Sequence, residues 1–169
     1  MNSTNIFNRL YENAGVFKTL MHGVSDDQAK WKPAGNKWSL LEVVNHLYDE
    51  ERDDFRLRLD LILHHPEKDW PPIDPEGWVI ERKYNQSDLG VSLNNFIAER
   101  RKSVEWLKNI AQPQWKNICV HPKIGEIRAG DMLAAWLAHD FLHMRQIVNV
   151  HLEYHSQKAK PFSIKYAAP

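Results

Sequence analysis

The sequence predicts an all-α protein that folds as a four-helix bundle, and three observations lead to this prediction. The 169 residues suit one domain, which we expect to span residues 1–169. Hydrophobic residues make up 43% of the chain, enough to build a sizeable core. Four long segments repeat apolar residues every three or four positions, and one long and two moderate connections join these segments.

Composition and charge exclude several classes of protein. Lys and Arg number 22, as do Asp and Glu, so the chain lacks the basic excess of a nucleic-acid binder. No stretch approaches the roughly 18 consecutive apolar residues of a membrane span, and the start lacks the apolar core of a signal peptide. Cys119 is the only cysteine, which fits a reducing cytosol. We therefore expect a cytoplasmic protein that binds neither nucleic acid nor membrane.

The first helix is expected over residues 4–21, followed by a short turn. Gly23 is a stop signal at its C-terminal end. In the turn, Ser25 and Gln28 have capping-box spacing, and Pro33 closes it. The apolar stripe of this helix consists of Ile6, Leu10, Phe17 and Leu20.

The second helix is expected over residues 38–63. Ser39 and Glu42 have the Ser-x-x-Glu spacing of a capping box, which indicates where a helix begins. The residues that we expect on one face of this helix are Val43, His46, Leu57 and Leu61.

The long connection between the second and third helices covers residues 64–78. Four prolines and a glycine in this stretch predict a loop without regular structure. The loop also carries Trp70 and Trp78, which is unusual for a simple linker. Such rings fold back over a site or, more commonly, cover exposed core.

The last two helices flank a small hairpin. The third helix is expected to begin at Ser87 or Asp88 and to end before Pro113. Residues 117–128 alternate loosely around a proline and a glycine, which predicts a hairpin. The fourth helix is expected over residues 130–154. The buried stripe of the third helix consists of Leu89, Leu93, Phe96, Ile97, Val104 and Leu107.

Two histidines lie on the apolar stripe of the fourth helix. His139 and His143 are four residues apart, so both rings lie on one face and can bind one ion at about 2.0–2.1 Å. Such an ion would remove the cost of burying unpartnered imidazoles, which is of the order of a few kcal/mol. The alternative is two core or rim histidines bonded to neighbours. His151 and His155 repeat the spacing near the end of the helix, and we interpret them as exposed and structural. Asp140 is rotated by about 100° from His139 around the helix axis, so it should not share the site of that histidine.

The third candidate ligand is His46, because metal sites in bundles are built from the inward faces of different helices. Glu50, one turn later, is a candidate catalytic residue, as a fourth ligand or a proton acceptor. The alternative is a solvated carboxylate, since residues 49–54 are rich in charge. The histidines expected to be solvated are His22, His64, His65 and His121.

These residues resemble the DinB-like superfamily of damage-inducible bacterial proteins. The family pattern Trp-Ser-x-x-Glu-x-x-x-His-Leu matches residues 38–47, and His-x-x-x-His-x-x-Gln-Ile matches residues 139–147. The resemblance implies an up-down-down-up bundle, often dimeric. It also implies one divalent ion, zinc or nickel, held by three histidines with open positions for water or substrate. The histidines that match the family ligands are His46, His139 and His143. Arg145 stands where the family often has glycine, so the substrate pocket cannot be inferred from relatives.

Three hypotheses for function follow. Characterised relatives use a low-molecular-weight thiol, so the resemblance favours a thiol-dependent S-transferase acting on a small electrophile. With water in the open position the protein is a metal-dependent hydrolase, in which Glu50 manages protons. A non-catalytic metal- or ligand-binding stress protein is the third hypothesis. Three tryptophans near the expected site would suit an apolar ligand: Trp38, Trp78 and Trp136. Packing in the core is the commoner role of such residues. We expect a small-molecule substrate and a homodimer.

Overall fold

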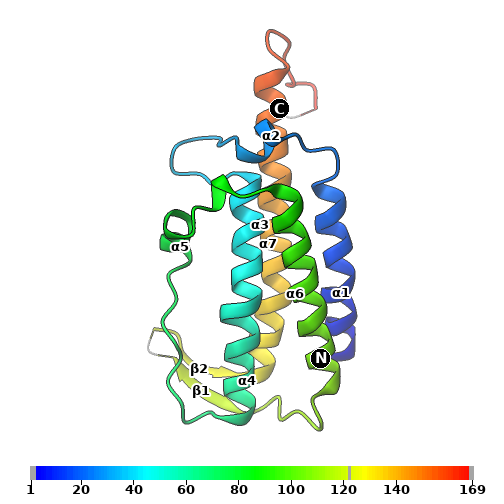
Figure 1. Cartoon of the computed structure of the whole chain (residues 1–169). Helices are drawn as coiled ribbons and strands as arrows, with labels where there is room; N and C mark the ends of the chain where they lie inside the picture. Colours follow the sequence, from blue (N-terminus) through cyan, green and yellow to red (C-terminus); the bar gives the residue numbers. More distant parts are fainter. Residues whose placement is uncertain (1–2, 122, 168–169) are drawn as a thin grey trace.

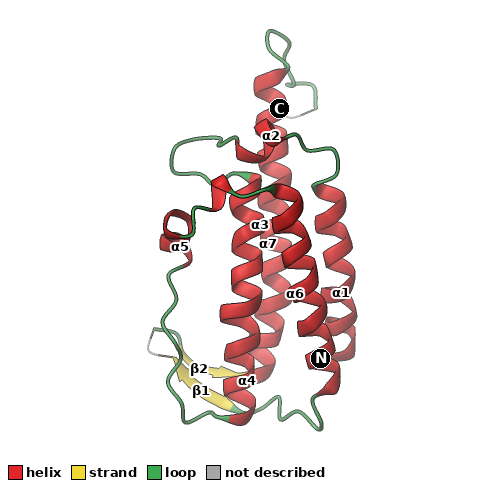
Figure 2. Ribbon diagram, in the orientation of Figure 1, coloured by secondary structure: helices red, strands yellow, loops and turns green. Residues whose placement is uncertain are grey.

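A computed structural model, which describes residues 3–121 and 123–167, shows four long helices packed side by side (Figures 1 and 2). They are α1 (Ser3–Leu20), the continuous rod of α3 (Leu40–Asp49), η1 (Glu50–Phe55) and α4 (Arg56–His64), then α6 (Leu89–Asn109) and α7 (Ala129–Lys158). In Figure 1, α1 and α7 run upward while the α3–α4 rod and α6 run downward. α1 packs on α6 and α7, and the α3–α4 rod packs on the same two helices. The predicted up-down-down-up bundle is thereby confirmed.

The turn after α1 forms a short helix and docks against α7. Gly23 adopts φ +74°, which glycine accommodates without strain, and α2 (Asp26–Lys30) follows. Ser25 accepts the Gln28 amide as expected. The Gln28 side chain instead contacts His151 Nδ1 at 2.9 Å, and His151 Nε2 lies 2.9 Å from the Leu20 carbonyl oxygen. The prediction that His151 is exposed was therefore wrong, because it joins α7 to both segments.

The second helix has the predicted extent, and Val43 and His46 are buried as expected, but the predicted face is wrong beyond η1. Its capping box is present, since Glu42 N donates to Ser39 Oγ and Ser39 N donates to Glu42 Oε2. In its middle, η1 is a π-helical segment, whose wider turns take up more residues than α-helical ones. The inward face therefore changes phase beyond η1. Leu57, expected inside, is 37% exposed, while Leu59 is fully buried.

The long connection contains regular structure, which corrects the prediction of a plain loop. It crosses from one end of the bundle to the other and includes α5 (Pro75–Glu81) and η2 (Tyr84–Gln86) (Figure 1). Asp74 caps α5 by accepting the Gly77 amide, and a proline suits the first turn of a helix because its missing N–H is not needed there. Trp78 and Tyr84 are buried, so this segment covers core.

The predicted hairpin is confirmed and leads directly into α7. β1 (Ile118–His121) pairs antiparallel with β2 (Gly125–Arg128), with Cys119 opposite Ile127. It lies beside α4 at the lower end of the bundle in Figure 2. No helix in the described part of the chain is long and apolar enough to cross a membrane.

Within the described residues, the bundle has two large core clusters, one toward each end, and a third, smaller cluster of Trp78, Val79 and Tyr84 lies under the long connection. One contains Trp136 of α7, and the other contains Ile147 of the same helix. Because His139 and His143 lie between these two residues on α7, they sit in the layer where the clusters meet. That layer contains the histidines that could hold a metal ion.

Candidate metal centre

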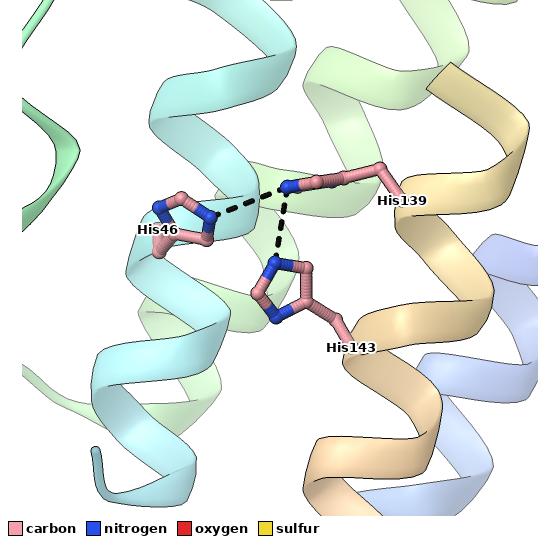
Figure 3. A group of neighbouring side chains, drawn as sticks. All are labelled: His46, His139 and His143. Carbon is pink, nitrogen blue, oxygen red and sulfur yellow. Dashed lines mark hydrogen bonds between the residues drawn. The ribbon is translucent and has the colours of Figure 1, made fainter. Parts of the chain in front are cut away.

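Three imidazoles converge on one point between α3 and α7 (Figure 3). His139 Nε2 lies 3.3 Å from His46 Nε2 and 3.0 Å from His143 Nε2. Two nitrogens that bind one tetrahedral ion at about 2.0–2.1 Å lie about 3.3–3.4 Å apart. The three nitrogens therefore have the spacing of a site for a single ion. In the described part of the chain, these three residues form a group whose ligand atoms all lie within 4.8 Å of one another.

Hydrogen bonds among the rings cannot satisfy this arrangement fully. His143 Nδ1 lies 2.7 Å from Gln146 Oε1, which can only accept, so Nδ1 carries the proton and Nε2 presents a lone pair. A proton on His139 Nε2 can point toward either His143 or His46, but not both. One close nitrogen–nitrogen contact is thus left without a shared proton, and a cation at the focus removes this conflict.

Burial keeps all three rings neutral. Burial, together with the neighbouring His143, lowers the pKa of His46 to about 3 and that of His139 to about 2. Burial also lowers the pKa of His143. Neutral imidazole is the form that binds a metal ion, because its lone pair is free. The site is therefore prepared to bind a cation at neutral pH.

The residues around the rings fix their orientation. Trp38 packs against His46 with ring centres 4.8 Å apart, and Phe55 packs against His139 at 4.9 Å. Gln146 orients His143, a role that the sequence analysis missed although the residue belongs to the second motif. Its position three residues after a candidate ligand, on the same helix face, was the available signal.

Glu50 lies behind His46 rather than at the focus of the three rings. Its Oε1 is 3.9 Å from His46 Nδ1, the nitrogen that faces away from His139. Both of these buried atoms lack a hydrogen-bond partner. Burial and the neighbouring Asp54 raise the pKa of Glu50 to about 8. The interpretation of this stretch as a solvated face was wrong: its buried carboxyl residues are Asp49, Glu50, Glu51 and Asp54.

A buried ion network lies next to the centre and was not predicted. Arg100, only 1% exposed, donates to Glu51 at 2.8 Å and to both oxygens of Asp140 at 2.7 Å. Trp136 Nε1 donates to the second oxygen of Glu51. Asp140 thus points away from the three rings, as expected. The signal for Arg100 was its position between Phe96 and Val104 on an otherwise apolar stripe.

The other candidates of the sequence analysis lie apart from the centre. Arg145 points to solvent, as do His155 and three histidines expected to be solvated: His22, His64 and His65. Trp78 stacks on Arg82, whose guanidinium carbon lies 4.0 Å from the ring centre. His121 is half-buried rather than solvated, since it packs against Trp70 with ring centres 5.2 Å apart.

Comparisons with known proteins agree with this architecture. The sequence profile of the DinB superfamily matches residues 9–147. The structure of YfiT from Bacillus subtilis, described as a probable metal-dependent hydrolase with an unusual four-helix bundle topology, superposes with a TM-score of 0.78. The two chains share 20% identity, and the match covers 88% of this chain and 85% of YfiT. No curated protein matches this sequence significantly.

Proposed function

Because the chain belongs to the DinB superfamily and three buried imidazoles converge between α3 and α7, we propose that it is a divalent-metal-dependent hydrolase. The observation that carries this proposal is the pair of Nε2 separations, 3.0 and 3.3 Å, at His139. The description of YfiT supports the same class of reaction, and its fold is shared by this chain.

The donor set fits zinc or nickel, one ion per chain. Imidazole nitrogens suit these metals, and three neutral rings leave the charge of a dication uncompensated. When bound, such an ion supplies a Lewis acid that lowers the pKa of coordinated water to about 7. The protein would hold the ion through His46, His139 and His143.

Other residues of the chain would orient these ligands. Gln146 holds the proton of His143 on Nδ1 and so keeps its Nε2 free for the ion. Glu50 Oε1 lies 3.9 Å from His46 Nδ1, and a closer approach in the metal-bound protein would let it accept a hydrogen bond from this nitrogen and fix the His46 tautomer in the same way. We therefore assign Glu50 as a positioning residue that acts through His46, in preference to a fourth ligand.

The comparisons favour water over a thiol in the open position. YfiT, whose fold this chain shares, is described as a probable metal-dependent hydrolase. We therefore prefer the hydrolase to the thiol-dependent S-transferase that the family resemblance favoured.

Metal analysis of the purified protein tests the centre. We expect about one divalent ion per chain by elemental analysis, and its loss in His46→Ala. The matched control is His155→Ala, which removes an exposed histidine from α7 and should leave the ion in place. Full occupancy in His46→Ala would rule out the assignment.

Two further measurements separate the classes of reaction. We expect the metal-loaded protein to hydrolyse uncharged esters such as phenyl acetate, and His46→Ala to lack this activity. Glu50→Met should retain folding but bind the ion more weakly, because it keeps an unbranched side chain and loses both oxygens that can accept from His46. Thiolate-to-metal charge-transfer bands on adding thiols to the cobalt-substituted protein, without ester hydrolysis, would favour the transferase instead.

A further inference from the structure

A cavity of about 400 Å³ lies beneath the hairpin, directly beside the candidate metal centre. We call it the hairpin cavity; its walls come from η1 and α4, from α7, and from the hairpin with the long connection. Phe55 joins it to the centre, because this residue lines the cavity and its ring centre lies 4.9 Å from that of His139. Ala135 and Met132, one and two turns before His139 on α7, line the opposite wall.

The cavity has the size and lining of a small-molecule site. Ligand sites in proteins occupy about 300–1,000 Å³ and are mostly apolar with a few polar groups. The apolar side chains that line this cavity are Phe55, Trp70, Ile124, Ile127, Met132 and Ala135. They derive from four separate segments, so a ligand here would contact rings and methyl groups on several sides. A small, largely apolar molecule fits this lining.

One hydrogen-bond donor at this cavity lacks an acceptor. Trp70 Nε1 is buried without a partner, although its ring lines the cavity and stacks on Arg58 at 4.7 Å. Leaving a buried donor unpaired is unfavourable, and such groups normally find a partner. An oxygen of a bound ligand would provide one. The long connection thus places Trp70, with its unpartnered N–H, among the residues that line the cavity.

The charges around the cavity disfavour an anionic ligand. Arg58 Nε lies 2.5 Å from Asp54 Oδ1, so its charge is already balanced. Asp131 is paired with Arg128 at 2.9 Å. Glu126 adds a further carboxylate to the rim, which leaves no unpaired arginine or lysine among the described residues that line the cavity. A ligand without negative charge is therefore favoured.

We propose that the hairpin cavity binds the non-reacting part of the substrate, and that this substrate is a small, uncharged, largely apolar compound with a hydrogen-bond-accepting oxygen, such as an ester or amide. The assignment as a substrate site rests on the proposed hydrolase function. Binding in the cavity does not, because none of the three histidines lines it. The two can therefore be tested separately.

Titration of the full chain with three probes of similar size tests the proposal. Acetophenone is uncharged and carries a carbonyl, benzoate is anionic, and benzylamine is cationic and lacks an oxygen acceptor. In ¹H–¹⁵N spectra, we expect acetophenone to shift the indole N–H signal of Trp70, assigned through its loss in Trp70→Phe. Benzoate and benzylamine should each bind at least tenfold more weakly. No shift of this signal with acetophenone, or tighter binding of benzoate, would overturn the proposal.

Two matched alanine-to-leucine variants show whether acetophenone binds in the hairpin cavity. Ala135 and Ala138 are both exposed on α7, but only Ala135 lines the hairpin cavity. Ala135→Leu should weaken acetophenone binding at least tenfold, while Ala138→Leu should bind it normally. Trp70→Phe keeps an aromatic ring and, followed by the backbone amide signals of Met132 and Ala135, should bind acetophenone about threefold to tenfold more weakly, the effect of one hydrogen bond. Equal affinity in the two leucine variants would place the ligand elsewhere.

The metal-free His46→Ala variant separates this proposal from the hydrolase. We expect it to bind acetophenone with unchanged affinity, because the cavity walls remain intact. If His46→Ala loses the metal ion but still binds acetophenone, the cavity proposal is supported independently of the hydrolase proposal. A complete loss of acetophenone binding in folded His46→Ala would contradict an independent cavity.

Discussion

Arg100 of α6 binds Asp140 of α7 through two parallel hydrogen bonds of 2.7 Å, and Asp140 is the residue next to His139. The same guanidinium donates to Glu51, the residue next to Glu50, and to the Leu10 carbonyl. One buried side chain therefore links all four long helices. Because paired guanidinium–carboxylate bonds are both strong and directional, this link restrains the two helices that carry the candidate ligands.

Arg100→Met should strongly destabilise the protein. The substitution keeps an unbranched side chain of similar length but leaves Glu51 and Asp140 buried without their partner. Breaking a buried ion pair in this way costs about 3–5 kcal/mol. Urea denaturation followed by circular dichroism would measure the free energy of unfolding. Arg101→Met is the matched control, since Arg101 is exposed, and we expect its effect to stay within about 0.5 kcal/mol. Similar stability of the two variants would show that the network contributes nothing.

Gln146→Ala should weaken metal binding while leaving the three histidines in place. The variant loses the acceptor, 2.7 Å from His143 Nδ1, that holds the ring in the ligating tautomer. Loss of such a group typically reduces metal affinity by about 10–100-fold. Competition with a chromophoric chelator would measure this affinity. Gln157→Ala removes an exposed glutamine from the same helix and serves as the control. Unchanged affinity in Gln146→Ala would count against its positioning role.

The metal-free protein should lose stability as the pH falls below about 6.5. Burial lowers the pKa of His46 to about 3 and of His139 to about 2, from 6.5 in the unfolded chain. Between these values the unfolded chain binds protons that the native rings do not. The stabilising contribution is complete above pH 6.5 and falls by up to about 1.4 kcal/mol per pH unit for each histidine below it.

Urea denaturation in EDTA between pH 7.5 and 4.5 would check this dependence. The raised pKa of Glu50 acts in the opposite direction, because its native carboxyl binds a proton that the unfolded one releases. The informative comparison is therefore with the variant in which all three histidines become glutamine. Its unfolding free energy should fall less steeply with acid, and parallel curves would contradict neutral burial of the rings.

Local sequence signals determined most of the helical plan. The capping box of Ser39 and Glu42 and the stop at Gly23 depend only on neighbouring residues, so they could be read in advance. The spacing of His139 and His143 is equally local, because a helix places residues four apart on one face. Their meeting with His46 was predicted from the inward faces of the bundle and the family resemblance.

Only the tertiary structure decided which polar groups are buried. Glu50, Glu51 and Asp54 look like a solvated run in sequence, yet all three are buried within η1. Glu51 has its partners on α6 and α7, which lie far away in the sequence. Arg100 lies inside because carboxylates from two other helices reach it. The hairpin cavity likewise needs Trp70 to fold back from a distant segment. Local periodicity reports which face a helix buries, but burial of a charge depends on groups that are close only after folding.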